Sequence, residues 1–197
     1  HLFFAFPGGS LQHSGTGTPY NWTVISGAAE LGLGDEVTGF ADDYAGILVV
    51  ACRNKTAALY GTSGDDWDFV KFPTDAGGIN WTLQTVGQPL YYDDTGLRSI
   101  AATQVYGDFA AATLSVNVKP LIDKKRKADV FTTASVRVKA KNQYRIFFDD
   151  NTGLIVDLSK GFKKPEFGPI NFGMVVRCAY SSEDADGSEV VLFGSDD

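Results

Sequence analysis

The sequence is poor in the side chains on which most enzymes and metal sites depend. Among its 197 residues are only two histidines, two cysteines and one methionine. His1 opens the chain, and His13 lies in the polar sequence GGSLQHSGTG, where we expect a surface loop. One loop histidine cannot complete a Ser–His–Asp or Cys–His arrangement, and this loop lacks the lysine of a phosphate-binding motif. We therefore expect no catalytic or cofactor-binding residues, and a protein that is not an enzyme.

Long apolar runs are also missing. None approaches the ~20 residues of a membrane-spanning helix, and the opening HLFFAF is too short for a signal peptide. Cys52 and Cys178 each follow an apolar run, ILVVAC and MVVRC. Buried cysteines in an unexported protein usually stay reduced. We predict two buried thiols on separate strands in preference to a disulfide, and assembly in the cytoplasm.

Basic residues are scarce in the first part of the chain and concentrated later. The net charge is −7, which disfavours general nucleic-acid binding. Yet nine of the seventeen Lys and Arg residues fall between Lys119 and Arg145. Lys124, Lys125, Arg126 and Lys127 form a basic run that is expected to contact DNA or an acidic neighbouring subunit.

This run lies in an irregular basic connector at about 114–130. Its apolar residues follow helical spacing, but Pro120 excludes a long helix. We expect a short helix or an extended connection there, with an apolar face of Leu114, Val118, Leu121 and Ile122.

What the chain has in abundance is glycine, 22 residues, together with 14 Phe and 8 Tyr. That composition, with apolar runs separated by Asp, Asn, Ser and Thr, predicts an all-β fold of short antiparallel strands. Adjacent runs pair as hairpins: GILVVAC with TAALYG, and SVRVKAK with YRIFFDD. Continuous ILVV predicts a strand covered on both faces, whereas alternating SVRVKAK predicts one near a sheet edge.

One hairpin is repeated. LYYDDTGLRSI (Leu90–Ile100) resembles IFFDDNTGLIV (Ile146–Val156), and VVLFGSDD begins a third copy that stops at Asp197. The interval between the second and third acid pairs is close to the ~40–50 residues of one four-stranded propeller blade. The sequence therefore predicts a single β-propeller-like domain over 1–197, with roughly three to four blades. Because the third copy is cut short, we expect an incomplete propeller, part of a longer protein or completed by strands supplied elsewhere.

Paired acids could form a catalytic site. Neighbouring residues on a strand point to opposite faces, however, so one pair cannot serve one site. We interpret these acids as solvent-exposed carboxylates of hairpin turns: Asp42–Asp43, Asp65–Asp66, Asp93–Asp94 and Asp149–Asp150. The sequence EDADG resembles part of a calcium loop, although a plain Asp-Gly turn is favoured. Its calcium candidates are Asp184, Asp186 and Glu189.

The order of strands and turns resembles the β-propeller region of tail nozzle proteins of short-tailed bacteriophages, also called tail tubular or tail-hub proteins. The resemblance covers most of residues 2–158. It rests on eight short segments of the sequence, in this order: LFFA near the start, Val37–Phe40, ILVVAC, Tyr60–Gly61, Gly77–Gly78, PLYYDDTGL, YGDF at Tyr106–Phe109, and PLID.

The resemblance implies a structural protein of the virion tail. Such a protein forms a ring, a hexamer in the intact parent, that encloses the channel through which genomic DNA leaves. Its partners would be copies of itself and the tail adaptor and tail fibre proteins. Two alternatives stay open: a carbohydrate-binding or carbohydrate-active propeller that uses Trp22, Trp67 or Trp81 as sugar platforms, and a general interaction scaffold.

Overall fold

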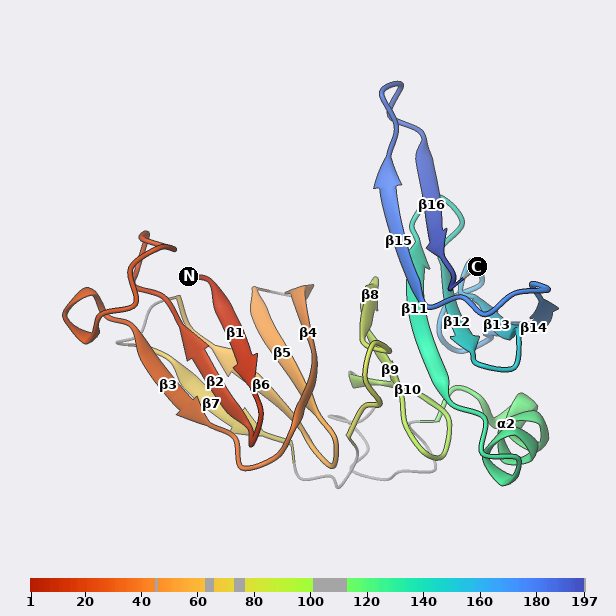
Figure 1. Cartoon of the computed structure of the whole chain (residues 1–197), viewed down its shortest axis with the longest axis horizontal. Coiled ribbons are helices and arrows are strands. Elements are labelled where there is room, and N and C mark those ends of the chain that lie inside the picture. Colours follow the sequence, from red (N-terminus) through yellow and green to blue (C-terminus); the bar gives the residue numbers. More distant parts are fainter. Residues whose placement is uncertain (45, 63–65, 73–76, 101–112, 197) are drawn as a thin grey trace. The chain divides into compact units, whose positions relative to one another are not determined.

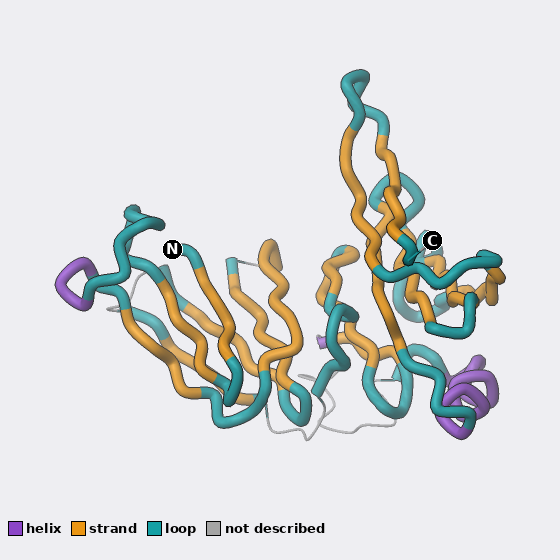
Figure 2. Tube along the Cα trace, in the orientation of Figure 1, coloured by secondary structure: helices purple, strands orange, loops and turns teal. Residues whose placement is uncertain are grey.

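A computed structural model describes residues 1–44, 46–62, 66–72, 77–100 and 113–196. The chain divides into two compact units, His1–Gly78 and Ile79–Asp197, and each is considered by itself. Strands dominate both units (Figures 1 and 2), and every strand pair in the described ranges is antiparallel, which confirms the all-β prediction. The YGDF segment, residues 63–65 of SGDDW, Asp197 and the side chains of Asp42 and Asp43 lie outside the description.

The described residues of the first unit form two sheets whose strands follow chain order. The three-stranded sheet A runs β1-β2-β3, and the four-stranded sheet C runs β4-β5-β6-β7. A short 3₁₀ helix, η1 (Val24–Ser26), precedes β3. The strands are β1 (Phe3–Phe6), β2 (Ser10–His13), β3 (Ala29–Gly32), β4 (Val37–Tyr44), β5 (Ile47–Cys52), β6 (Thr56–Tyr60) and β7 (Asp68–Lys71).

Sheets A and C pack face to face. Leu11 and Leu33 from the side of sheet A meet Val50 and Cys52 of β5 in one buried cluster. On β5 the adjacent residues Val49 and Val50 are both buried, so both faces of this strand are covered, as ILVV predicted. The predicted pairing of GILVVAC with TAALYG is confirmed as β5–β6.

The described residues of the second unit form three sheets, again in chain order: D with β8-β9-β10, E with β11-β12-β13-β14, and F, the hairpin β15-β16. An isolated bridge between Arg98 and Thr113 extends sheet D beyond β10. The strands are β8 (Gln84–Val86), β9 (Gln88–Tyr92), β10 (Leu97–Ser99), β11 (Thr132–Val138), β12 (Gln143–Phe148), β13 (Thr152–Asp157), β14 (Glu166–Asn171), β15 (Cys178–Glu183) and β16 (Glu189–Gly194).

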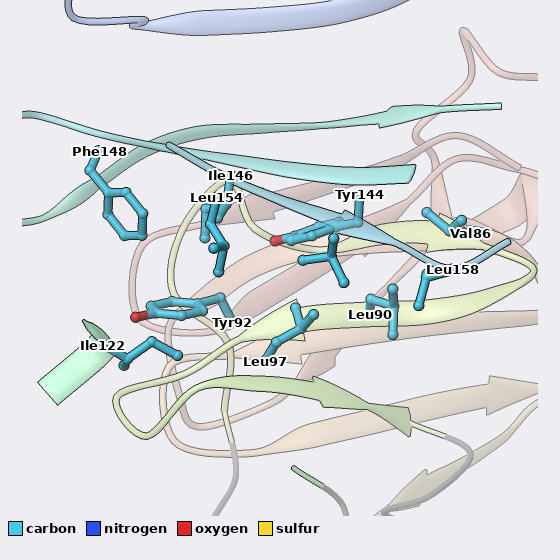
Figure 3. Packing of buried hydrophobic residues seen from close by; sticks show 11 residues of the cluster. Val86, Leu90, Tyr92, Leu97, Ile122, Tyr144, Ile146, Phe148, Leu154 and Leu158 are labelled. Atoms are coloured by element: carbon cyan, nitrogen blue, oxygen red, sulfur yellow. The ribbon is translucent and has the colours of Figure 1, made fainter. Parts of the chain in front are cut away.

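Sheet E is covered on both faces. Figure 3 shows Tyr144, Ile146 and Phe148 of β12 directed toward Tyr92 and Leu97 of sheet D, and all belong to one buried cluster. On the other face, a second cluster joins sheet E to sheet F and the segment before it; its members are Ala134, Val136, Phe147, Phe172, Val176, Ala179 and Val191. SVRVKAK and YRIFFDD pair as β11–β12, with β11 at the sheet edge, as predicted.

The basic connector contains helix α2 (Lys119–Lys127), preceded by the 3₁₀ turn η2 (Val116–Val118). Pro120 lies in the first turn of α2, where its missing N–H would have had no helical partner. Ile122 is buried in the core between sheets D and E, and Leu114, Val118 and Leu121 pack against that core. The predicted short helix and its apolar face are confirmed.

The predicted exposure is wrong for Cys178 and for His13. Cys52 is buried as expected and neither cysteine forms a disulfide, but Cys178 is exposed. His13 is not a surface loop residue: it lies on β2 with 2% of its area exposed, and its ring meets that of Trp67 edge-on at 4.4 Å. No sheet closes on itself among the described strands, and the grouping of the sheets into one propeller domain stays a prediction.

Candidate interaction surface at the hairpin tips and helix α2

The repeated sequence is a repeated structure. LYYDDTGLRSI forms the hairpin β9–β10 and IFFDDNTGLIV forms β12–β13, the second and third strands of their sheets. Tyr92 and Phe148, which precede the two acid pairs, meet edge-on with ring centroids 6.2 Å apart. The two copies therefore pack on each other across the core between sheets D and E.

The first hairpin tip is built around a buried carboxylate. The expectation of a solvent-exposed acid is wrong for Asp93, which is 6% exposed. One oxygen accepts hydrogen bonds from the N–H groups of Thr95 and Gly96, each at 2.7 Å, and from the Thr95 hydroxyl at 2.8 Å. The other forms an ion pair with Arg98, which is 2% exposed. The carboxylate of Asp93 and the guanidinium of Arg98 therefore neutralise each other in a site that is shielded from solvent.

Gly96 is required at this tip by a close approach. A Cβ at this position would lie 2.1 Å from Oγ of Ser115, which itself accepts the hydrogen bond of the Leu97 N–H. Ser115 follows Thr113, the residue bridged to Arg98. The glycine therefore allows the returning chain to lie against the hairpin.

The second tip is tied to helix α2. Lys125 donates to both oxygens of Asp150, at 2.8 and 3.1 Å, and to the Thr152 hydroxyl at 2.5 Å. Its ammonium also lies 4.4 Å from the centroid of the Phe148 ring. Partial burial acts to raise the pKa of Asp150, but the hydrogen bonds from Lys125 and Thr152 outweigh it, so the pKa lies below its ordinary value.

The turn chemistry of these tips recurs elsewhere. In each case an Asp or Asn oxygen accepts from both the N–H and the hydroxyl of a Thr or Ser two residues later. Beside the two tips, the pattern occurs at Asn21–Thr23, Asp157–Ser159 and Asp186–Ser188. At Asp157 the hydrogen bonds from the Ser159 hydroxyl and N–H, then from Gln143, lower the pKa to about 2.

Helix α2 offers only part of its basic run to a partner. Lys124, Arg126 and Lys127 are exposed, whereas Lys125 is buried against the second hairpin tip. Lys125 is therefore removed from the set predicted to contact DNA or a subunit. The four basic residues occupy the last turn of the helix, where their positive charges interact favourably with the negative end of the helix dipole. A partner contact by Lys124, Arg126 and Lys127 stays a prediction.

Two of the calcium candidates, Asp184 and Asp186, lie in the β15–β16 turn, and the third, Glu189, contacts the residues that follow β11. Glu189 accepts from the backbone N–H groups of Lys139 and Ala140, each at 2.7 Å, which ties sheet F to the end of β11. Asp184 accepts from the N–H of Ala185, and Asp186 from Ser188. Within the described ranges, no three His, Cys, Asp or Glu side chains are grouped so that they could hold a metal ion. The Asp-Gly turn that the sequence favoured is present, with Gly187 at φ 82°.

The three tryptophans have different surroundings. Trp22 stacks on Phe4 with ring centroids 5.3 Å apart, and Trp67 is enclosed by the rings of His1, Phe3 and His13. Trp81 is 72% exposed and adopts a left-handed backbone, φ 66°. Its carbonyl accepts a hydrogen bond from Ser135 at 2.6 Å.

Sequence reasoning missed Arg98 as the partner of Asp93, and Thr95 and Thr152 as the hydroxyls that complete the tips. The signal was available in the repeat itself, because both copies read Asp-x-Thr-Gly-Leu when aligned on their glycines. Aligned in this way, Asp93 corresponds to Asp150, the carboxylate that is ion-paired in each copy.

Comparison with known proteins identifies no family. No protein-family model matches the chain, and no curated protein matches it. No helix in the described parts of the chain is long and apolar enough to cross a membrane.

Proposed function

We propose that this chain is a structural part of the tail nozzle of a short-tailed bacteriophage. In this role it contributes propeller blades to a ring that encloses the DNA-ejection channel, and it contacts neighbouring subunits, the tail adaptor and tail fibre proteins. It is assembled in the host cytoplasm and functions in the virion tail.

The observation that carries this proposal is the arrangement of the sheets. Sheets C and E are four-stranded antiparallel meanders in chain order, sheets A and D are three-stranded meanders, and sheet F is a hairpin. Consecutive sheets pack face to face within both units: A on C, D on E, and E on F. Radially repeated four-stranded meanders with short connections are the construction of a propeller. Of the segments that resemble the nozzle family, LFFA, Val37–Phe40, ILVVAC and PLYYDDTGL lie on these sheets, whereas PLID lies in helix α2.

The use of the acids also favours a structural role. Asp93 and Asp150 hold hairpin tips through ion pairs, so neither is free to act as an acid or base. The net charge of −7 suits a channel wall that repels phosphates and lets DNA pass. We assign the exposed basic residues of α2 to a contact with an acidic neighbouring subunit.

Immunogold electron microscopy tests the proposal directly. Antibodies raised against the chain are applied to purified particles of the phage that encodes it. We expect label at the tail, below the portal vertex, and a ring with a central pore in negative-stain images of the full reading-frame product. Particles that contain none of this chain by mass spectrometry and immunogold would rule out the proposal.

DNA affinity provides a second test. Binding of duplex DNA is measured against salt for the wild type and for a Lys124→Ala/Arg126→Ala/Lys127→Ala variant. The matched control, Lys141→Ala/Lys163→Ala/Lys164→Ala, removes three other exposed cations. We expect weak binding, with Kd above roughly 10⁻⁵ M at physiological salt, for all three proteins. Tight, salt-sensitive binding that only the α2 variant loses would contradict a channel wall that does not hold DNA.

One observation favours the carbohydrate alternative: Trp81 is exposed, and an exposed indole is suited to stacking on a sugar ring. A glycan array with the wild type and Trp81→Ala separates the two functions. Binding that is lost in Trp81→Ala would favour the alternative, while an array without binding would remove it.

A further inference from the structure

A half-open cleft lies in the second unit, beside the tip of the β15–β16 hairpin. Its volume is about 660 Å³. Three segments line it: Lys139–Ala140 after β11, Tyr180–Glu183 of β15, and Gly187–Glu189, which lead into β16. Sites for small molecules commonly measure about 300–1,000 Å³, so the cleft is large enough for a compact ligand.

Glu189 holds the walls of this cleft together. Its carboxylate accepts hydrogen bonds from the N–H groups of Lys139 and Ala140, each at 2.7 Å, and from the Ser181 hydroxyl. These contacts join the hairpin to the residues that follow β11, so the cleft is preformed by contacts within the chain. The charge of Glu189 is compensated by the same contacts, so this residue fixes the cleft and is not the acid offered to a ligand.

Glu183 contributes a second carboxylate, which has no partner in the protein. The strand register places it opposite Glu189 on the same face of the hairpin, where two like charges are unfavourable. Its side chain is exposed, and no hydrogen bond or ion pair to it is formed by the described residues. In the same part of the chain, the Lys139 ammonium and the Ser182 hydroxyl also lack such partners. A ligand that donates hydrogen bonds to Glu183 would relieve this unfavourable arrangement.

The cleft offers a ligand balanced charges and one flat ring. Lys139 supplies a positive charge and Glu183 a negative one, while the charge of Glu189 is already compensated. Because the two remaining charges balance, the cleft favours a neutral ligand over an anion or a cation. Tyr180 is 68% exposed, and its ring combines an apolar surface with a polar hydroxyl.

A neutral sugar has the complementary chemistry. Its C–H groups form an apolar face that can lie on the Tyr180 ring, and its hydroxyls both donate and accept hydrogen bonds. The Glu183 carboxylate can only accept, the Lys139 ammonium can only donate, and the Ser182 hydroxyl can do both. An apolar ligand would leave these groups without partners, which is unfavourable.

We propose that this cleft binds a neutral saccharide. Tyr180 stacks on the sugar ring, Glu183 accepts hydrogen bonds from its hydroxyls, and Lys139 donates to one of its oxygens. Trp81 does not line the cleft, so the site is separate from that exposed indole. The inference goes beyond the proposed function and does not depend on it.

Saturation-transfer NMR with neutral disaccharides tests the site. The probes are maltose, lactose, mannobiose and N,N′-diacetylchitobiose at millimolar concentration, and the one with the strongest signal is then titrated by calorimetry. We expect Tyr180→Ala and Glu183→Gln each to weaken its binding roughly tenfold or more, since one removes the stacking surface and the other replaces a charged acceptor by a neutral one. Both side chains are exposed, so neither variant disturbs a core.

The matched controls lie beside the cleft but do not line it. Leu192→Ala changes the exposed residue opposite Tyr180, and Asp184→Asn removes the exposed charge next to Glu183. We expect both controls to bind like the wild type. Thermal unfolding followed by circular dichroism checks that all four variants are folded alike.

Several results would overturn the inference. They are a wild type that binds none of the probes, binding that Tyr180→Ala and Glu183→Gln leave unchanged, and binding that Trp81→Ala alone abolishes. Tighter binding of sialyllactose than of lactose would contradict a site for neutral sugars. None of these results affects immunogold labelling of the tail. Conversely, particles that lack the chain would remove the proposed function and leave a measured saccharide affinity intact.

Discussion

The Asp93–Arg98 ion pair is buried, although it belongs to a sequence motif that is typical of exposed turns. The two acids of LYYDDTG have the composition of an exposed turn, and Asp94 is indeed exposed. Asp93 differs because Arg98, five residues later, lies under the turn and because Thr113–Ser115 returns beside β10. Local sequence predicts the turn; the burial depends on a segment that arrives from farther along the chain.

Removal of this carboxylate should strongly destabilise the second unit. In Asp93→Ala the Arg98 guanidinium loses its partner in a buried position, and loss of one member of a buried pair costs about 3–5 kcal/mol. Asp94→Asn, at the exposed neighbouring position, should change the free energy of unfolding by about 1 kcal/mol or less. Urea unfolding monitored by circular dichroism measures both. Equal losses in the two variants would show that the pair is not the cause.

The turn at Asp157 should titrate at unusually low pH. Hydrogen bonds from Ser159 lower its pKa to about 2, against ~3.9 in an unfolded chain. Because the folded pKa is the lower one, the stabilisation is complete above the unfolded value and is lost as the pH falls through about 2. NMR titration of the carboxyl carbon measures it. Ser159→Ala should raise the pKa, and Ser159→Thr, which keeps the hydroxyl, should restore the low value.

At the scale of elements, hairpins were predictable and their surroundings were not. The pairs β5–β6, β9–β10, β11–β12 and β12–β13 follow from apolar runs joined by short polar turns. Strand β14 could not be predicted in this way, because Gly168 and Pro169 interrupt its apolar pattern. It is nevertheless paired with β13 at a sheet edge, where proline is tolerated. His13 and Cys178 were misplaced because their exposure depends on which sheet covers them.

Lys125 attaches the last turn of helix α2 to the second hairpin tip. Lys125→Ala removes the hydrogen bonds to Asp150 and Thr152 and the contact with Phe148, so we expect a loss of roughly 1–3 kcal/mol in the free energy of unfolding. Lys124→Ala, exposed on the same helix, should stay within about 0.5 kcal/mol. Denaturant midpoints at unchanged m-value give the comparison. A loss from Lys124→Ala as large as that from Lys125→Ala would contradict the attachment.

At the scale of the molecule, each compact unit has a core of its own. Leu11 is fully buried in the first and Leu90 in the second. Replacement of either by alanine should cost about 2–5 kcal/mol. We expect Leu11→Ala to shift the unfolding of His1–Gly78 and Leu90→Ala that of Ile79–Asp197, as separate transitions in calorimetry. One common transition, shifted equally by both variants, would favour the single domain that the sequence predicts.

The meander topology also has a kinetic consequence. Every named strand in the described ranges pairs only with its neighbours in the chain, so the contacts that build each sheet are local. Local contacts cost little loop-closure entropy and form quickly. On the ribosome, where about 5–20 residues are added each second, a sheet can form before the next one is synthesised. Its apolar face then stays open until the following sheet covers it, so the order of translation becomes the order of packing.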